Sequence, residues 1–200
     1  MLNLISLFQK GGIIMYPLVF CSFSAVAITV ERILFYKEKN TSLADTNMLS
    51  KYLAKGDIQA VQAVADKAGG DIAEIVRYYF NLKQDEAGKV QALETKANIL
   101  MSTYEEKLSF LSTIITLAPL LGLLGTIFGM IASFNVFSLQ SSQPFAITSG
   151  IGEALIATSF GLLVAIVTLV LYHYLKYRIA KLDKKLELCC LNLLTIGSIK

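Results

Sequence analysis

Three long apolar stretches constrain the fold of this chain more than any other feature of its sequence. The first covers residues 13–36 and is interrupted only by the charged pair Glu31 and Arg32, the second covers residues 108–139, and the third covers residues 150–175. Each is at least as long as the roughly 20 residues that an α-helix needs to cross a bilayer. Because lipid cannot satisfy backbone polar groups, the stretches predict three transmembrane helices.

The composition supports a membrane protein and excludes several other classes. Of the 200 residues, 54% are hydrophobic and only 16% are charged, against about a quarter in an ordinary soluble domain. A soluble protein of this length could not cover so much apolar surface with so few charges. The net charge of +3 comes from basic residues interleaved with acidic ones, so we expect contact with membrane lipid and no nucleic-acid partner.

The first apolar stretch has one alternative interpretation, a cleaved signal peptide. Ala25, Val26 and Ala27 resemble the small-residue pattern of a cleavage site, and a single basic residue, Lys10, precedes the stretch. The apolar run exceeds the usual length of a signal-peptide core, so a retained transmembrane helix is favoured.

The distribution of basic residues predicts the orientation in the membrane. Of the 18 Lys and Arg residues, Lys10 alone precedes the first span, and the connector between the second and third spans has none. Because positive residues favour the cytoplasmic side, we expect the N-terminus outside and both charged regions in the cytoplasm. The predicted fold is an all-α membrane protein, three transmembrane helices with long cytoplasmic helical extensions. Its expected parts are the outer N-terminus with the first transmembrane helix (1–36), a cytoplasmic helical domain (37–107), the second transmembrane helix (108–139), an outer connector (140–149), the third transmembrane helix (150–175) and a cytoplasmic C-terminal helix (176–200).

Capping signals divide the first charged region into helices. Gly56 followed by Asp57 predicts the end of one helix and the start of the next. Gly70 followed by Asp71 repeats the signal, and Glu74 three residues later predicts a capping box.

Two longer helical patterns adjoin the second and third spans. From Asp85 no strong helix breaker occurs before Pro119, which predicts one long helix rising into the second span. After the third span, Leu182, Leu186 and Cys189 repeat at helical spacing and predict that the third helix continues beyond the membrane.

Glu153 is the only formal charge within residues 108–175. An ionisable group at the centre of a span costs about 2.5–3.5 kcal/mol on insertion scales and is tolerated where it faces protein or a water-filled path. Glu153 begins an i, i+4 row with Ala157, Gly161 and Ala165, so we expect it on a face of small residues that other helices can approach. This placement predicts a functional carboxylate that carries protons.

The second span has a matching stripe of small or hydroxylated residues. Gly122, Thr126 and Gly129 follow one another at spacings of four and three, and Gly125 lies beside them. Packing this stripe against the Glu153 face predicts that Thr126 and Thr158 lie near the carboxylate.

Each of these residues also has a structural interpretation. Glu153 lies a few residues past the connector, where it could simply be hydrated at the outer interface. The glycine and alanine faces are typical of tight helix packing, which is compatible with a channel. A threonine in a span usually bonds its own backbone.

The sequence does not favour an enzyme. It has one histidine, no nucleophile elbow and no Gly-Lys-Ser/Thr loop. Cys21 lies in an apolar run, and Cys189 and Cys190 are adjacent without the spacing of zinc ligands. We therefore expect three free thiols, no cofactor and no metal site.

Two motifs resemble one membrane family over nearly the whole chain. Residues 117–130, Leu-Ala-Pro-Leu-Leu-Gly-Leu-Leu-Gly-Thr-Ile-Phe-Gly-Met, resemble the second-span signature of ExbB and TolQ. Residues 150–166, which begin Gly-Ile-Gly-Glu-Ala-Leu-Ile-Ala-Thr, resemble their third-span signature. Residues 15–18, Met-Tyr-Pro-Leu, together with Glu31 and Arg32, are similar to the first span of ExbB-type proteins. The chain is thus identified as a member of the MotA/TolQ/ExbB proton channel family, with three spans rather than the four of MotA.

The resemblance implies a homo-pentamer in the bacterial cytoplasmic (inner) membrane, with its N-terminus in the periplasm. The pentamer surrounds a dimeric, single-span partner like ExbD or TolR, which supplies a membrane aspartate, and a TonB- or TolA-like protein completes the machine. In the family, the residues matching Glu153, Thr126 and Thr158 line the ion path. The helix-packing and pore-lining residues expected here are Gly122, Gly125, Gly129, Ala157, Gly161 and Ala165.

The resemblance implies that proton flow drives rotation, most simply to energise TonB-dependent outer-membrane transport. The motifs leave open a TolQ-type role in envelope maintenance, another motor of the family, and sodium in place of protons. A non-conducting membrane scaffold is the alternative from a different functional class.

Overall fold

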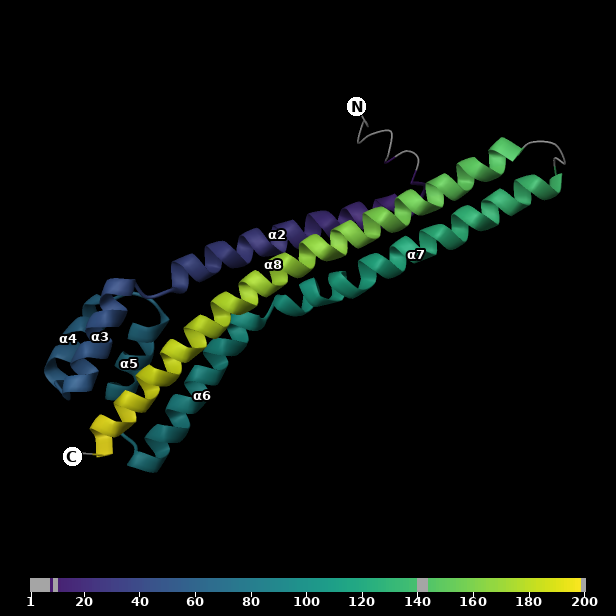
Figure 1. The fold of residues 1–200 in the computed structure, drawn as a ribbon. Helices are drawn as coiled ribbons and strands as arrows, with labels where there is room; N and C mark the ends of the chain where they lie inside the picture. Colours follow the sequence, from purple (N-terminus) through teal and green to yellow (C-terminus); the bar gives the residue numbers. More distant parts are fainter. Residues whose placement is uncertain (1–7, 9–10, 140–143, 199–200) are drawn as a thin grey trace. The chain divides into compact units, whose positions relative to one another are not determined.

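The computed structural model describes residues 8, 11–139 and 144–198, and within them every helix or strand assigned is an α-helix. The helices in chain order are α2 (Met15–Lys39), α3 (Leu43–Lys55), α4 (Ile58–Lys67), α5 (Asp71–Asn81), α6 (Glu86–Glu105), α7 (Leu108–Leu139) and α8 (Pro144–Ser198) (Figure 1). Among these residues, three helical segments are long and apolar enough to cross a membrane, and each overlaps one of the three predicted spans. The predicted all-α membrane fold is confirmed.

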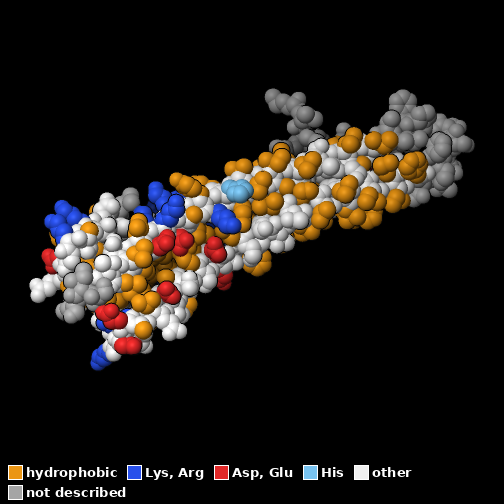
Figure 2. All heavy atoms as spheres, turned by 60° about the horizontal axis from the view of Figure 1, so that its bottom comes forward, with side chains coloured by type: hydrophobic (Ala, Val, Ile, Leu, Met, Phe, Trp, Pro, Cys, Tyr) orange, Lys and Arg blue, Asp and Glu red, His pale blue; other side chains and the backbone are white. Residues whose placement is uncertain are grey.

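The chain divides into two compact units. The membrane unit consists of residues 1–30 and 107–174, and the charged unit consists of residues 31–106 and 175–200. Among the described residues of the membrane unit, the only formal charges are Lys107 and Glu153. Figure 2 shows the same division from outside, because ionic side chains gather over the charged unit and hydrophobic ones cover the visible membrane unit.

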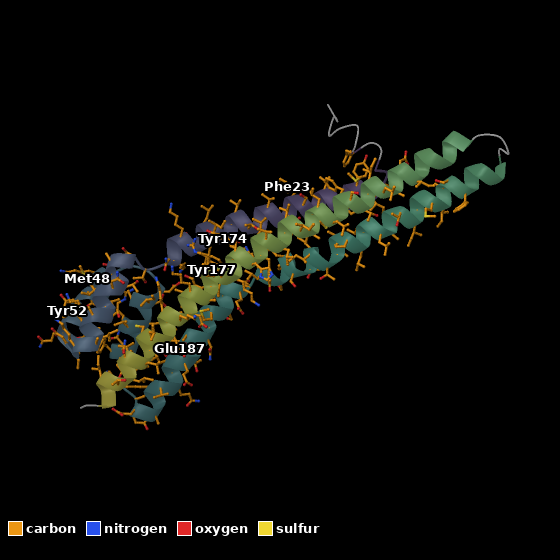
Figure 3. All side chains as sticks on the ribbon, viewed as in Figure 1. Phe23, Met48, Tyr52, Tyr174, Tyr177 and Glu187 are labelled. Atoms are coloured by element: carbon orange, nitrogen blue, oxygen red, sulfur yellow. The ribbon has the colours of Figure 1, made fainter. Side chains whose placement is uncertain are left out.

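In the membrane unit, α2, α7 and α8 run side by side (Figure 1). Leu18, Ala118 and Ala157 are almost completely buried between the helices. In each membrane-crossing segment, however, no more than 33% of the most apolar window is buried. Phe23, for example, is 74% exposed and points away from the bundle (Figure 3). Apolar surface of this extent needs lipid or other protein chains to cover it.

Helix α8 is longer than the sequence pattern predicted. Its first residue is Pro144, so residues 144–149 of the expected connector form its first turns, and residues 140–143 lie outside the described part of the chain. Proline suits the first position of a helix, because its missing N–H would have no partner there. The helix continues for 55 residues to Ser198, with Leu186 fully buried and Lys184 exposed, as the tail pattern predicted.

The expected single helix from residue 85 into the second span is wrong at one point. A turn at Glu106 and Lys107 separates α6 from α7, although Glu106 keeps helical backbone angles (φ −46°, ψ −47°). The carbonyls of residues 103 and 104 would accept from residues 107 and 108 in an unbroken helix. Arg32 Nη1 donates to the carbonyl of residue 103 (3.1 Å), and the Tyr36 hydroxyl donates to that of residue 104 (2.8 Å). These side chains from α2 therefore satisfy the acceptors that the break leaves open.

The helix boundary between α3 and α4 confirms the predicted stop and start. Gly56 has a left-handed backbone (φ 71°), and its N–H donates to the carbonyl of Leu53 (3.1 Å). Asp57 then caps α4, because its carboxylate accepts from the backbone N–H of Ala60 (3.1 Å). Glycine is favoured at such a position, since other residues are strained at positive φ.

The predicted capping role of Asp71 is wrong. Gly70 occupies the cap position with φ 90°, and Asp71 is the first residue of α5, with 3% of its surface exposed. The Tyr104 hydroxyl donates to Asp71 Oδ2 at 2.5 Å. Thr41 performs the capping from another segment, because its hydroxyl oxygen accepts from the N–H of Ile72 (3.1 Å). Sequence spacing could not reveal this, since Thr41 is distant along the chain.

The buried Asp71 predicts a specific pH dependence of stability. Burial raises the pKa of its carboxyl, and the hydrogen bond from Tyr104 offsets part of that rise. The folded chain therefore holds this proton more tightly than the unfolded chain does. Its contribution to stability is present below the unfolded pKa, about 4, and is lost as the pH rises through the raised folded pKa.

We expect Asp71→Asn to remove this decrease in stability at higher pH, because the amide stays neutral and its oxygen can still accept from Tyr104. Thermal unfolding of the full chain in detergent, followed over roughly pH 4 to 8, measures it. The exposed Asp66→Asn is the matched control and should follow the unmodified chain. Identical pH profiles for the unmodified chain and Asp71→Asn would contradict the prediction.

Candidate functional site: the packed face of α7 and α8

Helices α7 and α8 approach each other closely along small residues. A Cβ atom placed on Gly122 would lie 3.0 Å from Thr158 Cα, and one placed on Gly125 would lie 2.7 Å from Ala157 Cβ. Both separations leave no ordinary room for a side chain. Glycine at these positions therefore sets how near the two backbones come.

The contact is built from both helices. A Cβ atom on Gly161 of α8 would lie 2.6 Å from the carbonyl oxygen of Ala118, and one on Gly129 of α7 would lie 2.8 Å from Ala154 Cβ. Ala165 is also buried, with 8% exposed. The structure thus places all six residues expected at the helix-packing face in the buried or half-buried part of this unit: Gly122, Gly125, Gly129, Ala157, Gly161 and Ala165.

The two candidate threonines bond to backbone carbonyls in different ways. Thr158 donates its hydroxyl proton across the contact to the carbonyl of Gly122 (2.8 Å). Thr126 donates to the carbonyl of Leu123 in its own helix (2.6 Å). Each hydroxyl oxygen keeps lone pairs that can accept a further hydrogen bond.

Glu153 lies outside this packed face. Its side chain is exposed, while the neighbouring Ala154 and the next-turn Ala157 are 3% and 1% exposed. An i, i+4 row drifts by about 40° per step, so Glu153 lies roughly 80° around the helix from Gly161. In the described part of the chain no hydrogen bond joins Glu153 to Thr126 or Thr158. The small residues of the row pack against α7, and the carboxylate at its start does not.

The surroundings of Glu153 in one chain are apolar and open. Ile151 and Leu155 flank it in sequence and are 41% and 61% exposed. A carboxylate that faced hydrocarbon here would cost about 2.5–3.5 kcal/mol. Contact of this part of α8 with water or with another protein surface would avoid that cost.

The described interior of the membrane unit offers no second polar path. Its buried hydroxyls donate to carbonyls four residues earlier in their own helices, and no buried side-chain nitrogen or oxygen lacks a partner among the described residues. These hydroxyls belong to Thr29, Ser133 and Thr168. The described polar side chains inside the membrane unit therefore already have partners, whereas Glu153 lies on the outer face of α8.

Arg32, which in the sequence is one of two charged residues within the first apolar stretch, has a structural role. Its side chain is 4% exposed, its Nε donates to Glu31 Oε2 at 2.8 Å, and its guanidinium lies 4.7 Å from the centre of the Phe35 ring. Its bond to the carbonyl of Thr103 spans 71 positions in sequence. Only the periodicity of both helices together could have indicated that pairing.

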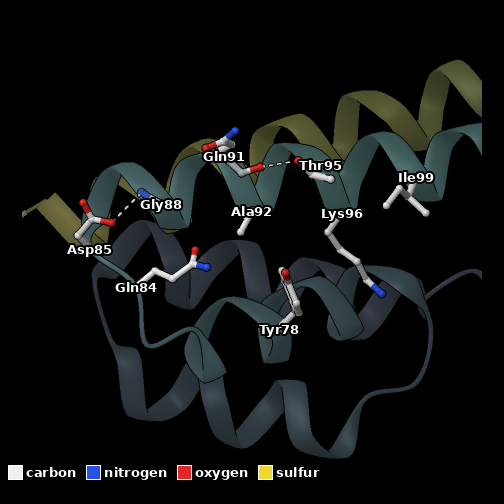
Figure 4. Close-up of a pocket in the computed structure, with 9 residues that line it drawn as sticks. All are labelled: Tyr78, Gln84, Asp85, Gly88, Gln91, Ala92, Thr95, Lys96 and Ile99. Atoms are coloured by element: carbon white, nitrogen blue, oxygen red, sulfur yellow. Dashed lines mark hydrogen bonds between the residues drawn. The ribbon is translucent and has the colours of Figure 1, made fainter.

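A hollow of about 550 Å³ between α5 and α6 is lined by Tyr78, Asp85 and Lys96 among others (Figure 4). Its charged groups already bond within the fold. Asp85 caps α6 by accepting from the N–H of Gly88 (3.2 Å), and Lys96 pairs with Glu74 at 2.7 Å. This pairing replaces the predicted capping box of Glu74, and the hollow presents no group arranged for catalysis.

The cysteines are free, as expected. Burial raises the pKa of Cys189 to about 12 and that of Cys190 to about 11. Thiols with such values are almost fully protonated at neutral pH, so they are poor nucleophiles and poor metal ligands.

These features define a polytopic membrane protein with one carboxylate on the open face of a glycine-packed helix pair. Residues 59–188 match the sequence pattern of the MotA/TolQ/ExbB proton channel family. This range includes all of α7 and α8 as far as residue 188. The chain belongs to this family, as its motifs predicted.

Several known proteins are similar to this chain, over different shares of their length. An ExbB-like biopolymer transport protein of Synechocystis is 33% identical, with 86% of this chain and 70% of the relative covered. The biopolymer transport protein ExbB of Neisseria gonorrhoeae is 26% identical, with 87% of each covered. The Tol-Pal system protein TolQ of Haemophilus influenzae is 31% identical over 48% of this chain and 43% of the relative.

The packed face predicts that Gly161→Ala destabilises the membrane unit. The new methyl group would meet the carbonyl oxygen of Ala118, a backbone atom that cannot move without shifting α7. Overpacking of this kind costs typically about 1–3 kcal/mol. Gly152→Ala is the matched control, because the same helix gains the same methyl group with no atom within 4 Å.

Thermal unfolding of both variants in detergent measures the difference, and the equal change in helix propensity cancels between them. A lower transition temperature for Gly161→Ala alone is expected. Equal transition temperatures would show that α7 and α8 do not depend on this contact.

Proposed function

We propose that this chain is the stator subunit of an inner-membrane motor that converts the proton motive force into mechanical work. The family and its ExbB and TolQ relatives support a channel-type membrane subunit. The exposed position of Glu153 on an otherwise apolar helix face carries the proposal, because a single chain gives this carboxylate no partner.

The carboxylate is the proton carrier in this proposal. Moving one charge through the membrane field yields about 2.3 kcal/mol per 100 mV, which can drive a cycle of protonation coupled to movement. Thr126 and Thr158 take part through their hydroxyl oxygens, which can accept from a hydrated proton or water, since their own protons already go to carbonyls. Gly122 and Gly161 keep the helices close enough to hold Thr158 beside the path.

The partner is a dimeric single-span protein like ExbD or TolR, held inside a pentamer of this chain. One carboxylate per chain is a thin proton path, and an aspartate from the partner would complete it. The wide apolar surfaces of α7 and α8 support such an assembly, because neighbouring chains and the partner can cover them.

The load is TonB-dependent outer-membrane transport rather than the Tol system. The two ExbB-type relatives described above cover 86% and 87% of this chain, whereas the TolQ relative covers 48%. In the proposed orientation the N-terminus is periplasmic and residues 37–107 and 176–200 are cytoplasmic, because these two regions hold most of the basic residues.

Substitution of the carboxylate tests the proton path. In proteoliposomes that contain the chain and its partner, we expect Glu153→Gln to reduce proton flux to the background level while assembly is unchanged. Glu187→Gln, which neutralises an exposed carboxylate in the charged unit (Figure 3), should leave the flux intact. Replacing sodium with potassium in the buffer tests the ion, and a flux that persists identifies protons.

Retained proton flux or retained activity in cells for Glu153→Gln would favour the scaffold alternative. The Gln side chain keeps the size of Glu and its hydrogen-bonding oxygen, so a change in packing is not expected to mimic the loss.

Purification from native membranes tests the assembly. Native mass spectrometry should find five copies of this chain with two copies of a small single-span protein, and a TonB-like protein in weaker association. A TolA-like protein in its place would assign the Tol-type load, and a lone oligomer without a membrane carboxylate from a partner would contradict the motor.

A further inference from the structure

A second hollow in the charged unit, of about 280 Å³, has a different chemistry from the first. It is lined by residues of α2, α6 and α8 and by Asn40, which follows α2. Its charged lining residues are Arg178, Lys181 and Lys185, at helical spacing on α8, and none of its lining residues is acidic. The nearby acidic residues of that helix segment, Asp183 and Glu187, are exposed and do not line it.

The opposite wall of the hollow is aromatic and fixed in place. The rings of Tyr36 and Tyr104 stack with centres 5.1 Å apart and planes inclined by 23°. The Tyr36 hydroxyl donates to the carbonyl of Tyr104 (2.8 Å), and the Tyr104 hydroxyl donates to Asp71 (2.5 Å). Since both phenol protons are already bonded, a ligand here would be held chiefly by Lys181 and Lys185.

The row of cations begins at the depth where a lipid headgroup would be. The third predicted span ends at Leu175, and the rise of 1.5 Å per residue puts Arg178 roughly 5 Å and Lys185 roughly 15 Å beyond it. The polar layer on each side of the hydrocarbon core is roughly 5 to 8 Å thick. The hollow therefore begins at headgroup depth at Arg178, whereas Lys181, roughly 9 Å beyond the span, lies at the outer edge of the polar layer and Lys185 lies outside it. Tyr177, 67% exposed beside Arg178 and labelled in Figure 3, suits such an interface.

We propose that this hollow binds a phosphate group, and that its source is the headgroup of an anionic phospholipid. Basic pockets next to membrane spans on the cytoplasmic side are typical sites for anionic headgroups. A zwitterionic headgroup adds an ammonium group that the three cations would repel. The volume is just below the range of about 300–1,000 Å³ for pockets that enclose whole ligands, so the acyl chains would remain outside.

The test uses the full chain in nanodiscs that contain equal amounts of phosphatidylglycerol and phosphatidylcholine. Native mass spectrometry counts the lipids of each kind that stay bound. The unmodified chain should retain phosphatidylglycerol preferentially. The double variant Lys181→Gln with Lys185→Gln should reduce that preference about 30-fold. Each lysine near an anionic surface contributes roughly fivefold to binding, and the two factors multiply.

The matched control is Lys184→Gln with Lys51→Gln, which removes the same charge at exposed positions that do not line the hollow. It should keep the preference, and so should Lys181→Arg with Lys185→Arg, which keeps the charge. If the double glutamine variant fails to assemble, Lys181→Gln alone, at an exposed position, should lose about fivefold. Glu153→Gln should retain the lipid, which separates this site from the proton path.

A second arm identifies the source of the phosphate. Inorganic phosphate is added to the chain in nanodiscs of phosphatidylcholine alone, and its phosphorus resonance is monitored. One outcome is that the unmodified chain broadens the phosphorus resonance, the double glutamine variant does not, and neither shows a lipid preference. That outcome would keep the phosphate site and assign it to free phosphate. The proposal would be overturned if the double glutamine variant and the matched control lost the preference for phosphatidylglycerol equally. It would also be overturned if the unmodified chain showed neither a lipid preference nor broadening of the phosphate resonance.

Discussion

The close contact between α7 and α8 determines the chemistry of the membrane unit. Lipid gives helices no hydrophobic reason to associate, so they are held by dense packing and by hydrogen bonds between them. Here Gly122 and Gly161 remove the side chains that would keep the backbones apart, and Thr158 can then reach the carbonyl of Gly122. Because this contact uses the small-residue face of α8, it also fixes which residues of that helix remain on the outside. Glu153 is one of them.

That outcome makes the carboxylate available to other chains. A buried Glu153 would have been sequestered between α7 and α8, where the hydroxyls already bond to carbonyls. At the edge of the packed face it meets whatever surrounds the subunit, and hydrocarbon is an unfavourable neighbour for it. The proposed proton path is accordingly one that assembly completes. An exposed carboxylate on an apolar helix is compatible with membership of a channel family.

The charged unit is stabilised by different means. Water is available there, so side chains can complete the hydrogen bonds that a regular helix would make. Arg32 and Tyr36 of α2 bond to the last carbonyls of α6, and Tyr104 extends the network to the buried Asp71. The turn after Glu105 is possible because these donors are present. The same tyrosines form one wall of the cationic hollow, so the network that ends α6 also shapes a binding surface.

The sequence alone determined the three spans, the helical class, the family and the glycine-rich faces, because these depend on local length, hydropathy and residue size. It also gave the boundary at Gly56 and Asp57, where both signals are adjacent in the chain. Only the tertiary structure decided the rest. The capping of α5 by Thr41, the bond from Arg32 to Thr103 and the burial of Asp71 join residues distant in sequence, which no local pattern encodes. Packing also decided the side on which Glu153 lies. An i, i+4 row drifts around its helix, and the contact with α7 selects which residues of the row are covered.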